Sequence, residues 1–273
     1  MAATYLTQRS LAHPVRAAQR ILLEWWHLLH LSAVLLVLAL TPASYNRTNR
    51  TVLARHLYTN TAPILLGFTL VCALVTVVLT RIVLVTALSY GLSQYALQLV
   101  IRVLVLELIP LTAALFVALR CTIPDGAELL AMHASGQLNA DGGKPLDSIQ
   151  REVLPRAVAG LFSGTTLAAL SSTVVLVVAY LSSYGFSITG WSSFVRLFGQ
   201  VFNPAVTLIF FLKTLFFCLT VSLIPMASAL YGMRGAAGQG LASVRTSAEM
   251  RGLVRMFTVI LLIEMVSLVG NYY

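Results

Sequence analysis

Long runs of apolar residues, separated by short polar stretches, dominate the hydrophobic pattern of this chain. Each run holds about 20 residues or more, the length that a helix needs to cross a hydrocarbon core of about 30 Å. Leu, Val and Ala follow one another without the alternation of apolar and polar positions that a membrane β-strand shows. The pattern predicts an all-α polytopic membrane protein, with runs at 61–80, 82–119, 157–181, 205–231 and 253–270.

A shorter apolar segment, residues 28–40, precedes these runs. Its length suits a helix that lies in the membrane surface better than one that crosses the membrane. An interfacial helix also keeps all six early arginines in the cytoplasm, as the positive-inside bias prefers: Arg9, Arg16, Arg20, Arg47, Arg50 and Arg55. A crossing segment is the alternative, and it would place the last three arginines outside. We expect an N-terminal interfacial helix followed by five transmembrane helices.

The same charge bias predicts the direction of each span. No apolar core or small-residue cleavage site occurs in the first twenty residues, so the N-terminus is expected in the cytoplasm. The basic stretch 120–156 then lies in the cytoplasm and the C-terminus lies in the periplasm. We therefore divide the chain into an N-terminal part, 1–60, and a transmembrane domain, 61–273.

Composition agrees with a membrane protein and argues against other classes. Hydrophobic residues make up 58% of the 273 residues and charged residues only 10%. Topology and anionic headgroups account for the net charge of +9, so nucleic-acid binding is not expected. Three widely spaced cysteines are expected to be inert apolar residues, and Glu24, His27 and His30 to face headgroups instead of a metal.

The polar interruption at 120–156 contains a second amphipathic pattern. Apolar or small residues recur at steps of three and four from Ala127 to Leu138, and "DGGKP" ends the pattern. This spacing predicts a short helix between two spans, lying on the membrane or in the groove of a soluble partner. The sequence "GGKP" at 142–145 lacks the distal glycine and the Ser or Thr of a P-loop. The chain is therefore not expected to be an ATPase or another enzyme.

Several short motifs occur in the order found in one family of permeases. The chain resembles the MlaE/YrbE family of ABC-transporter permeases in four segments. "LELIPLTAALFVALR" resembles the family motifs E-L-G-P and G-R-A-G-S, and "AELLAM" resembles A-E-x-x-x-M. "GQLNA" resembles E-Q-x-x-A, and "LPRAVAGL" resembles P-R-x-x-A. The resemblance covers roughly residues 50–273. It implies a homodimer in the bacterial inner membrane, a cytoplasmic ATPase that binds the ATP, a periplasmic MCE-domain protein, and phospholipid or a similar hydrophobic cargo. No cofactor of the chain's own is implied.

The resemblance also implies a coupling helix that docks on the ATPase. Its candidate residues are Glu128, Met132, Gln137 and Leu138. The chain departs from the family motifs at Leu106, at 119–123 ("LRCTI"), and at Gly136, where the family has its coupling Glu. These departures indicate a divergent ATPase partner, altered coupling or an inactive copy.

Four charged residues inside apolar runs are the candidate site: Arg102, Glu107, Lys213 and Glu264. An unpaired charge in the membrane costs at least about 2.5 kcal/mol, so each should face a cavity, an interface or a partner. The last three match charged positions of the family. A buried Lys213–Glu264 pair that holds two helices together is one expectation, and contact with a lipid headgroup is the other. Arg102 has no acidic neighbour at i±3 or i±4, so its partner must lie elsewhere.

Two other functions remain open on the sequence alone. A secondary transporter would use Glu107, Lys213 or Glu264 as a proton relay, although the chain shows no internal repeat of the kind common in such transporters. A scaffold that holds an ATPase or an MCE-domain protein would not need these charges.

Overall fold

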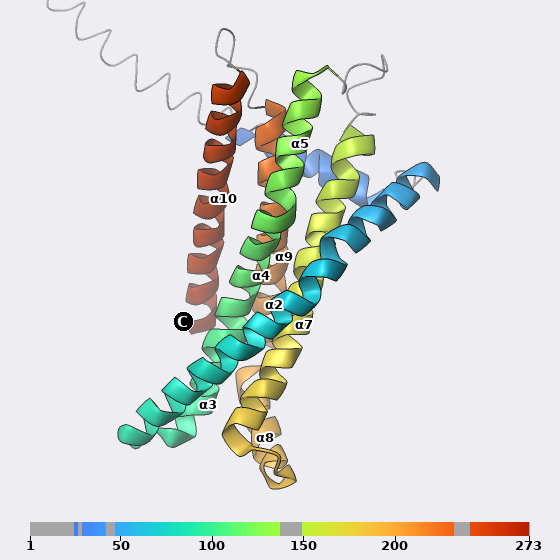
Figure 1. The fold of residues 1–273 in the computed structure, drawn as a ribbon. Helices are drawn as coiled ribbons and strands as arrows, with labels where there is room; N and C mark the ends of the chain where they lie inside the picture. The colour runs from blue at the N-terminus through green and yellow to red at the C-terminus, as the bar shows by residue number, and fades with distance from the viewer. Residues whose placement is uncertain (1–24, 27–28, 42–46, 137–148, 232–240, 273) are drawn as a thin grey trace, which may run out of the picture.

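The computed structural model describes residues 25–26, 29–41, 47–136, 149–231 and 241–272. Within these residues all regular structure is helical, and five helices are long and apolar enough to cross a membrane. They span Arg50–Ser89, Tyr95–His133, Ile149–Tyr184, Pro204–Leu230 and Glu249–Asn271. The predicted all-α, five-span architecture is therefore confirmed (Figure 1).

The first span belongs to helix α2 (Arg47–Ser89), which crosses over α7 (Leu154–Tyr184) in Figure 1. The boundary expected at residue 60 falls inside α2, because this helix begins in the polar stretch before the apolar run. Helix α9 (Pro204–Tyr231) and helix α10 (Leu241–Tyr272) form the fourth and fifth spans and pack against each other.

The second span is one continuous helix with changes of pitch. It comprises α3 (Ser93–Ile101), the π-helix Arg102–Leu108, α4 (Ile109–Val117), the π-helix Ala118–Thr122 and α5 (Ile123–Ala134). The sequence predicted a span ending at residue 119 and a separate helix after it. That prediction was wrong about the connection, because α5 continues the span through a π-helical turn instead of following a loop.

Proline explains where the pitch changes. Among the described residues each π-helix ends two residues before a proline: Pro110, Pro124 and, after the π-helix Ile149–Val153, Pro155. A proline has no N–H to donate, and its ring clashes with the carbonyl four residues earlier. A wider turn with i→i+5 bonds moves that carbonyl away from the ring. These prolines therefore allow the helix to continue with altered side-chain directions.

A short helix, Leu29–Leu40, lies across one end of the bundle (Figure 1). Its Leu31 and Leu35 are buried against Leu129, Leu154 and Met226, which come from α5, α7 and α9. We call this the α5 end, because α5 and α9 end there and α7 and α10 begin there. The C-terminus lies toward the opposite end (Figure 1).

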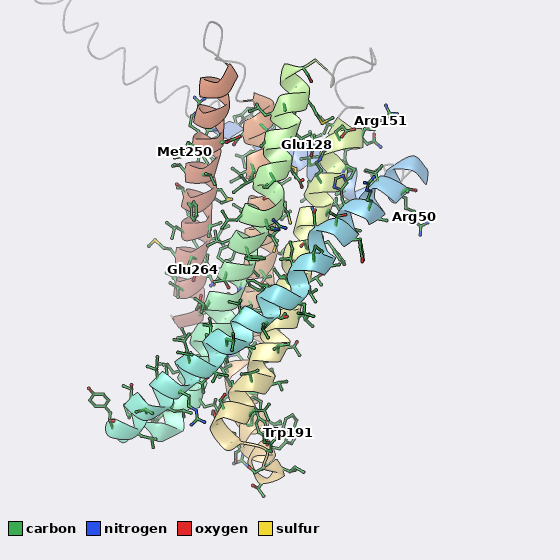
Figure 2. The ribbon with its side chains drawn as sticks, viewed as in Figure 1. Arg50, Glu128, Arg151, Trp191, Met250 and Glu264 are labelled. Atoms are coloured by element: carbon green, nitrogen blue, oxygen red, sulfur yellow. The ribbon has the colours of Figure 1, made fainter. Side chains whose placement is uncertain are left out.

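The opposite end, which we call the α8 end, carries aromatic residues. Helix α8 (Trp191–Val201) packs there against the end of α7, with the Tyr180 ring 5.6 Å from Trp191 and 5.2 Å from Phe194. Figure 2 shows Trp191 at this end and Glu128 at the other. Aromatic rings of this kind are typical of a membrane interface.

Glycines allow α7 to approach α9 closely. A Cβ at Gly164 would lie 2.6 Å from Cys218 Sγ, and one at Gly160 would lie 2.8 Å from Ser222 Oγ. Small residues in such positions let two membrane helices gain van der Waals contact along their backbones. Cys72, Cys121 and Cys218 are free thiols.

We predict that Gly164→Ala lowers the free energy of unfolding by about 1–3 kcal/mol, because the added methyl group overpacks the α7–α9 contact. Gly67→Ala is the matched control, since no atom lies within 4 Å of its added Cβ. Thermal unfolding in detergent, followed by tryptophan fluorescence, measures both. Equal melting temperatures for the two variants would contradict the proposed packing.

Candidate functional site

A buried lysine occupies the middle of the fourth span. Lys213 is 2% exposed, and its Nζ contacts the carboxylates of Glu107 and Glu264, the latter at 2.7 Å. Its ammonium also lies 5.6 Å from the centre of the Phe217 ring. Asn271 Nδ2 donates to the second oxygen of Glu107 at 3.3 Å. We call Glu107, Lys213, Glu264 and Asn271 the charge cluster.

The charge cluster joins three spans. Glu107 belongs to the π-helix of the second span, Lys213 to α9, and Glu264 and Asn271 to α10. The π-helix ends two residues before Pro110, so the widened turn that this proline favours sets the direction of Glu107. The predicted Lys213–Glu264 pair is confirmed, and Glu107 is a second carboxylate on the same lysine.

Burying these three charged groups in the membrane has an electrostatic cost. Two carboxylates share one ammonium, so the charge cluster carries a net charge of −1 when all three groups are ionised. Desolvation offsets much of the attraction in such a pair, so it is weak as a source of stability. Removing one partner, in contrast, leaves a buried charge without compensation. Charged groups kept inside a membrane at this cost are typical of functional sites.

Arg102 does not join the charge cluster, although it lies in the same π-helix as Glu107. Its side chain is half-buried, and among the described residues its buried Nε has no hydrogen-bond partner. The expectation that its partner lies outside its own helix stays a prediction.

A second polar group forms at the α5 end around Arg156, which is 5% exposed. Its Nη1 donates to the Glu152 carboxylate at 3.0 Å and to the Glu152 carbonyl at 3.1 Å, and its Nη2 lies 3.4 Å from Glu128 Oε1. Asp125 and His56 lie within electrostatic reach of the same guanidinium. We call Arg156, Glu152, Glu128 and Asp125 the Arg156 cluster.

Sequence reasoning missed the role of Arg156. The residue stands in the "LPRAVAGL" motif, at the polar start of the third span, where a charge looks solvent-exposed. Glu152 lies four residues before Arg156, a spacing that supports an ion pair on one helix face and was the available signal. The contact with Glu128 joins two helices, so no local pattern shows it.

The sequence profile described as Permease MlaE matches residues 53–269. The chain belongs to the MlaE permease family. Membership confirms the resemblance drawn from the short motifs. No curated protein matches the chain in a sequence comparison. The five spans and the family together make this chain a multi-pass membrane protein of the permease class.

The candidate coupling residues of this MlaE-family permease lie at the α5 end. Glu128 has a 60% exposed side chain and Met132 is half-buried. Gln137 and Leu138 lie outside the described residues. Figure 2 shows Glu128 and Arg151 at this end, with Glu264 deeper in the bundle. The ATPase contacts of these four residues stay a prediction.

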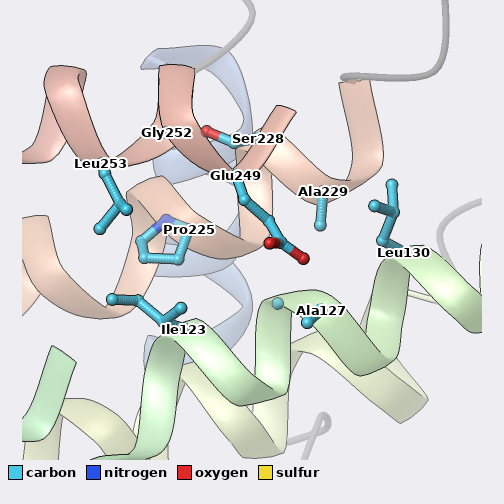
Figure 3. Close-up of a pocket in the computed structure, with 10 residues that line it drawn as sticks. Ile123, Ala127, Leu130, Pro225, Ser228, Ala229, Glu249, Gly252 and Leu253 are labelled. Atoms are coloured by element: carbon cyan, nitrogen blue, oxygen red, sulfur yellow. The ribbon is translucent and has the colours of Figure 1, made fainter. Parts of the chain in front are cut away.

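A small pocket of about 20 Å³ separates α5 from α9 and α10 at this end (Figure 3). The Glu249 carboxylate points into it, across from Ala127 (Figure 3). This volume is enough for about one water molecule. Nearby, a Cβ at Gly126 would lie 3.1 Å from the Pro225 carbonyl oxygen, so α5 and α9 nearly touch.

Two larger grooves of the permease open at the sides of α9. One of about 600 Å³ lies between α7 and α9, and its lining combines threonines with aromatic rings: Thr165, Thr166, Thr173, Thr214, Phe210 and Phe211. The other, of about 390 Å³, lies beneath the short N-terminal helix and includes Trp25 and Phe216. Both grooves are lined mainly by apolar side chains.

We predict that Lys213→Met lowers the free energy of unfolding of this permease by about 3–5 kcal/mol, because it leaves Glu107 and Glu264 buried without their cation. The triple variant Glu107→Gln, Lys213→Met, Glu264→Gln removes all three charges and should recover most of the loss. Thermal unfolding in detergent measures both. A triple variant less stable than Lys213→Met would contradict the electrostatic explanation.

Proposed function

We propose that this chain is the membrane subunit of an ABC transporter that moves phospholipid, or a similar hydrophobic molecule, between the inner membrane and a periplasmic MCE-domain protein. A separate cytoplasmic ATPase supplies the energy, and two copies of the chain form the permease. Membership of the MlaE permease family over residues 53–269 is the observation that carries the proposal. The α5 end faces the cytoplasm and the α8 end the periplasm.

The grooves beside α9 support a lipid cargo. A phospholipid has acyl tails that need an apolar surface and a headgroup that needs polar partners. The α7–α9 groove offers Phe210 and Phe211 beside four threonine hydroxyls. Phe217 of the same helix is buried in the core instead. The lateral position of the groove gives a lipid access from the bilayer without passage through water.

The α5 end supports an external source of energy. No P-loop occurs in the sequence, and the candidate coupling residue Glu128 is exposed there. The continuous helix of the second span contains Glu107 of the charge cluster and ends at this surface, so it provides a mechanical connection. ATP binding by the partner would move α5 and thereby rearrange the spans that enclose the lipid.

The first experiment is purification of the chain at native expression level in mild detergent, with mass spectrometry of the proteins and lipids that accompany it. We expect an ABC ATPase, an MCE-domain protein and phospholipid. The chain by itself, with none of the three, would contradict the proposal.

The charge cluster provides a functional test in the reconstituted complex. We expect the triple variant Glu107→Gln, Lys213→Met, Glu264→Gln to bind the ATPase but to transfer phospholipid at least about tenfold more slowly, equivalent to about 1.4 kcal/mol of activation free energy. Transfer between donor and acceptor vesicles of a fluorescent phospholipid measures the rate. An unchanged rate would favour a scaffold that does not need these charges.

One observation favours a second candidate. Two carboxylates and a lysine buried in the spans are the kind of groups that relay protons in secondary transporters. Such a transporter would move its substrate in vesicles that contain only this chain and a pH gradient. Transport that needs the ATPase and ATP, and ignores the gradient, would exclude it.

A further inference from the structure

The Arg156 guanidinium does not use all of its donors. Nη1 and Nη2 reach Glu152 and Glu128, but Nε is buried and has no hydrogen-bond partner within the described part of the chain. The side chain is only 6% exposed, so bulk solvent reaches little of it. An unsatisfied buried donor costs about 1–3 kcal/mol, and more when it is charged.

A matching acceptor lies unused in the same cluster. Asp125 Oδ2 is buried and has no hydrogen-bond partner among the described residues, and both the Asn60 amide and Arg156 lie close enough to stabilise the Asp125 carboxylate. Asp125 precedes Glu128 by three residues, which puts both carboxylates on one face of α5. Arg156 therefore faces two alternative acids on the same helix and pairs with only one of them.

The two present contacts of Arg156 differ in strength. Glu152 lies on the same helix face, binds at 3.0 Å, and adds its backbone carbonyl as a second acceptor. Glu128 comes from another helix, lies at 3.4 Å, and has a 60% exposed side chain that water solvates. The Glu128 contact is the weaker one and is the one that a movement of α5 would break.

We propose that Arg156 is a positioning residue for coupling, which exchanges Glu128 for Asp125 when α5 moves against α7. This inference rests on the proposed function, because the ATPase drives the movement. In the present state Arg156 is bound to Glu152 and Glu128. In the other state Glu128 is free to bind the ATPase, and Asp125 Oδ2 accepts from Arg156 Nε. Glu152 holds the guanidinium in place in both states.

At Gly126 the contact between α5 and α9 leaves room for this movement. Gly126 lies against the Pro225 backbone, so no side chain interlocks α5 with α9 at this point. Asp125 and Glu128 are separated by about 4.5 Å along the helix axis, three residues at 1.5 Å each. A slide of a few ångströms or a small rotation is of the size known for helix shifts in switching proteins.

The continuous second span carries the movement onward. From Glu128 to Glu107 the helix runs without a loop, over a length of about 30 Å. Glu107 holds Lys213, so a displaced α5 changes the position of a carboxylate in the charge cluster. The exchange at Arg156 would thus link ATPase docking to the spans that enclose the lipid.

Distance measurements between spin labels on α5 and α7 test the exchange. We would label Ala131→Cys and Phe162→Cys, both exposed, in a chain whose three cysteines are replaced by alanine. Double electron–electron resonance is recorded in nanodiscs for the chain alone, and for the complex with its ATPase, with and without nucleotide. We expect nucleotide to change the distance by about 2–5 Å in the complex.

Two substitutions should act in opposite directions, which a purely structural role would not produce. Glu128→Gln weakens the present pair, so the chain alone should already show the shifted distance. Asp125→Asn removes the alternative acid, so the complex should keep the resting distance with nucleotide, whereas Asp125→Glu should restore the shift. Ser135→Ala, an exposed residue outside the Arg156 cluster, is the control and should behave as the unmodified chain.

Each outcome decides the proposal. The exchange would be overturned if both variants, Glu128→Gln and Asp125→Asn, showed the same distances as the unmodified chain. It would also be overturned if both variants shifted the distance equally. If Asp125→Asn does not fold, Glu128→Gln decides by itself. If no ATPase binds the unmodified chain, the proposed function fails. The exchange can still be tested then, by comparing the spin-label distance in isolated Glu128→Gln with that in the isolated unmodified chain.

Discussion

A charge inside a membrane needs a partner, and in this chain that constraint connects three of the five spans. Lys213 of α9 is held by Glu107 of the second span and Glu264 of α10. Hydrophobic association cannot order these helices, because lipid tails are as apolar as their side chains. The ion pairs supply a specific register that leucine and valine lack. Movement of one span must therefore be matched by movement of the others or by exchange of partners.

Prolines influence the direction in which the acidic side chains of the two polar clusters point. Two of the described π-helices contain a carboxylate of a polar cluster. Glu107 of the charge cluster lies in one, and Glu152 of the Arg156 cluster lies in the other. Each of these π-helices ends two residues before a proline. The widened turn changes the direction of the acid without breaking the helix. A rigid span can in this way carry side chains that a regular α-helix would aim elsewhere.

Both polar clusters also share the continuous helix from Tyr95 to His133. Glu107 lies twelve residues after the start of this helix, and Glu128 lies five residues before its end. In the function proposed here, the ATPase acts at Glu128 and the lipid is enclosed by the spans around Lys213. A helix without a loop transmits displacement better than the separate coupling helix that the sequence led us to expect, because a loop would absorb it.

The sequence by itself determined the class of the protein, the five spans, the short helix before them and the family, because apolar runs, arginine placement and motif order are local properties. It also singled out Glu107, Lys213 and Glu264, since charges stand out in apolar runs. Only the tertiary structure decided that one lysine serves both acids, and that Glu128 contacts Arg156. Those contacts join residues from different helices, with Glu107 and Lys213 separated by 106 positions, and helix packing alone sets which of them meet.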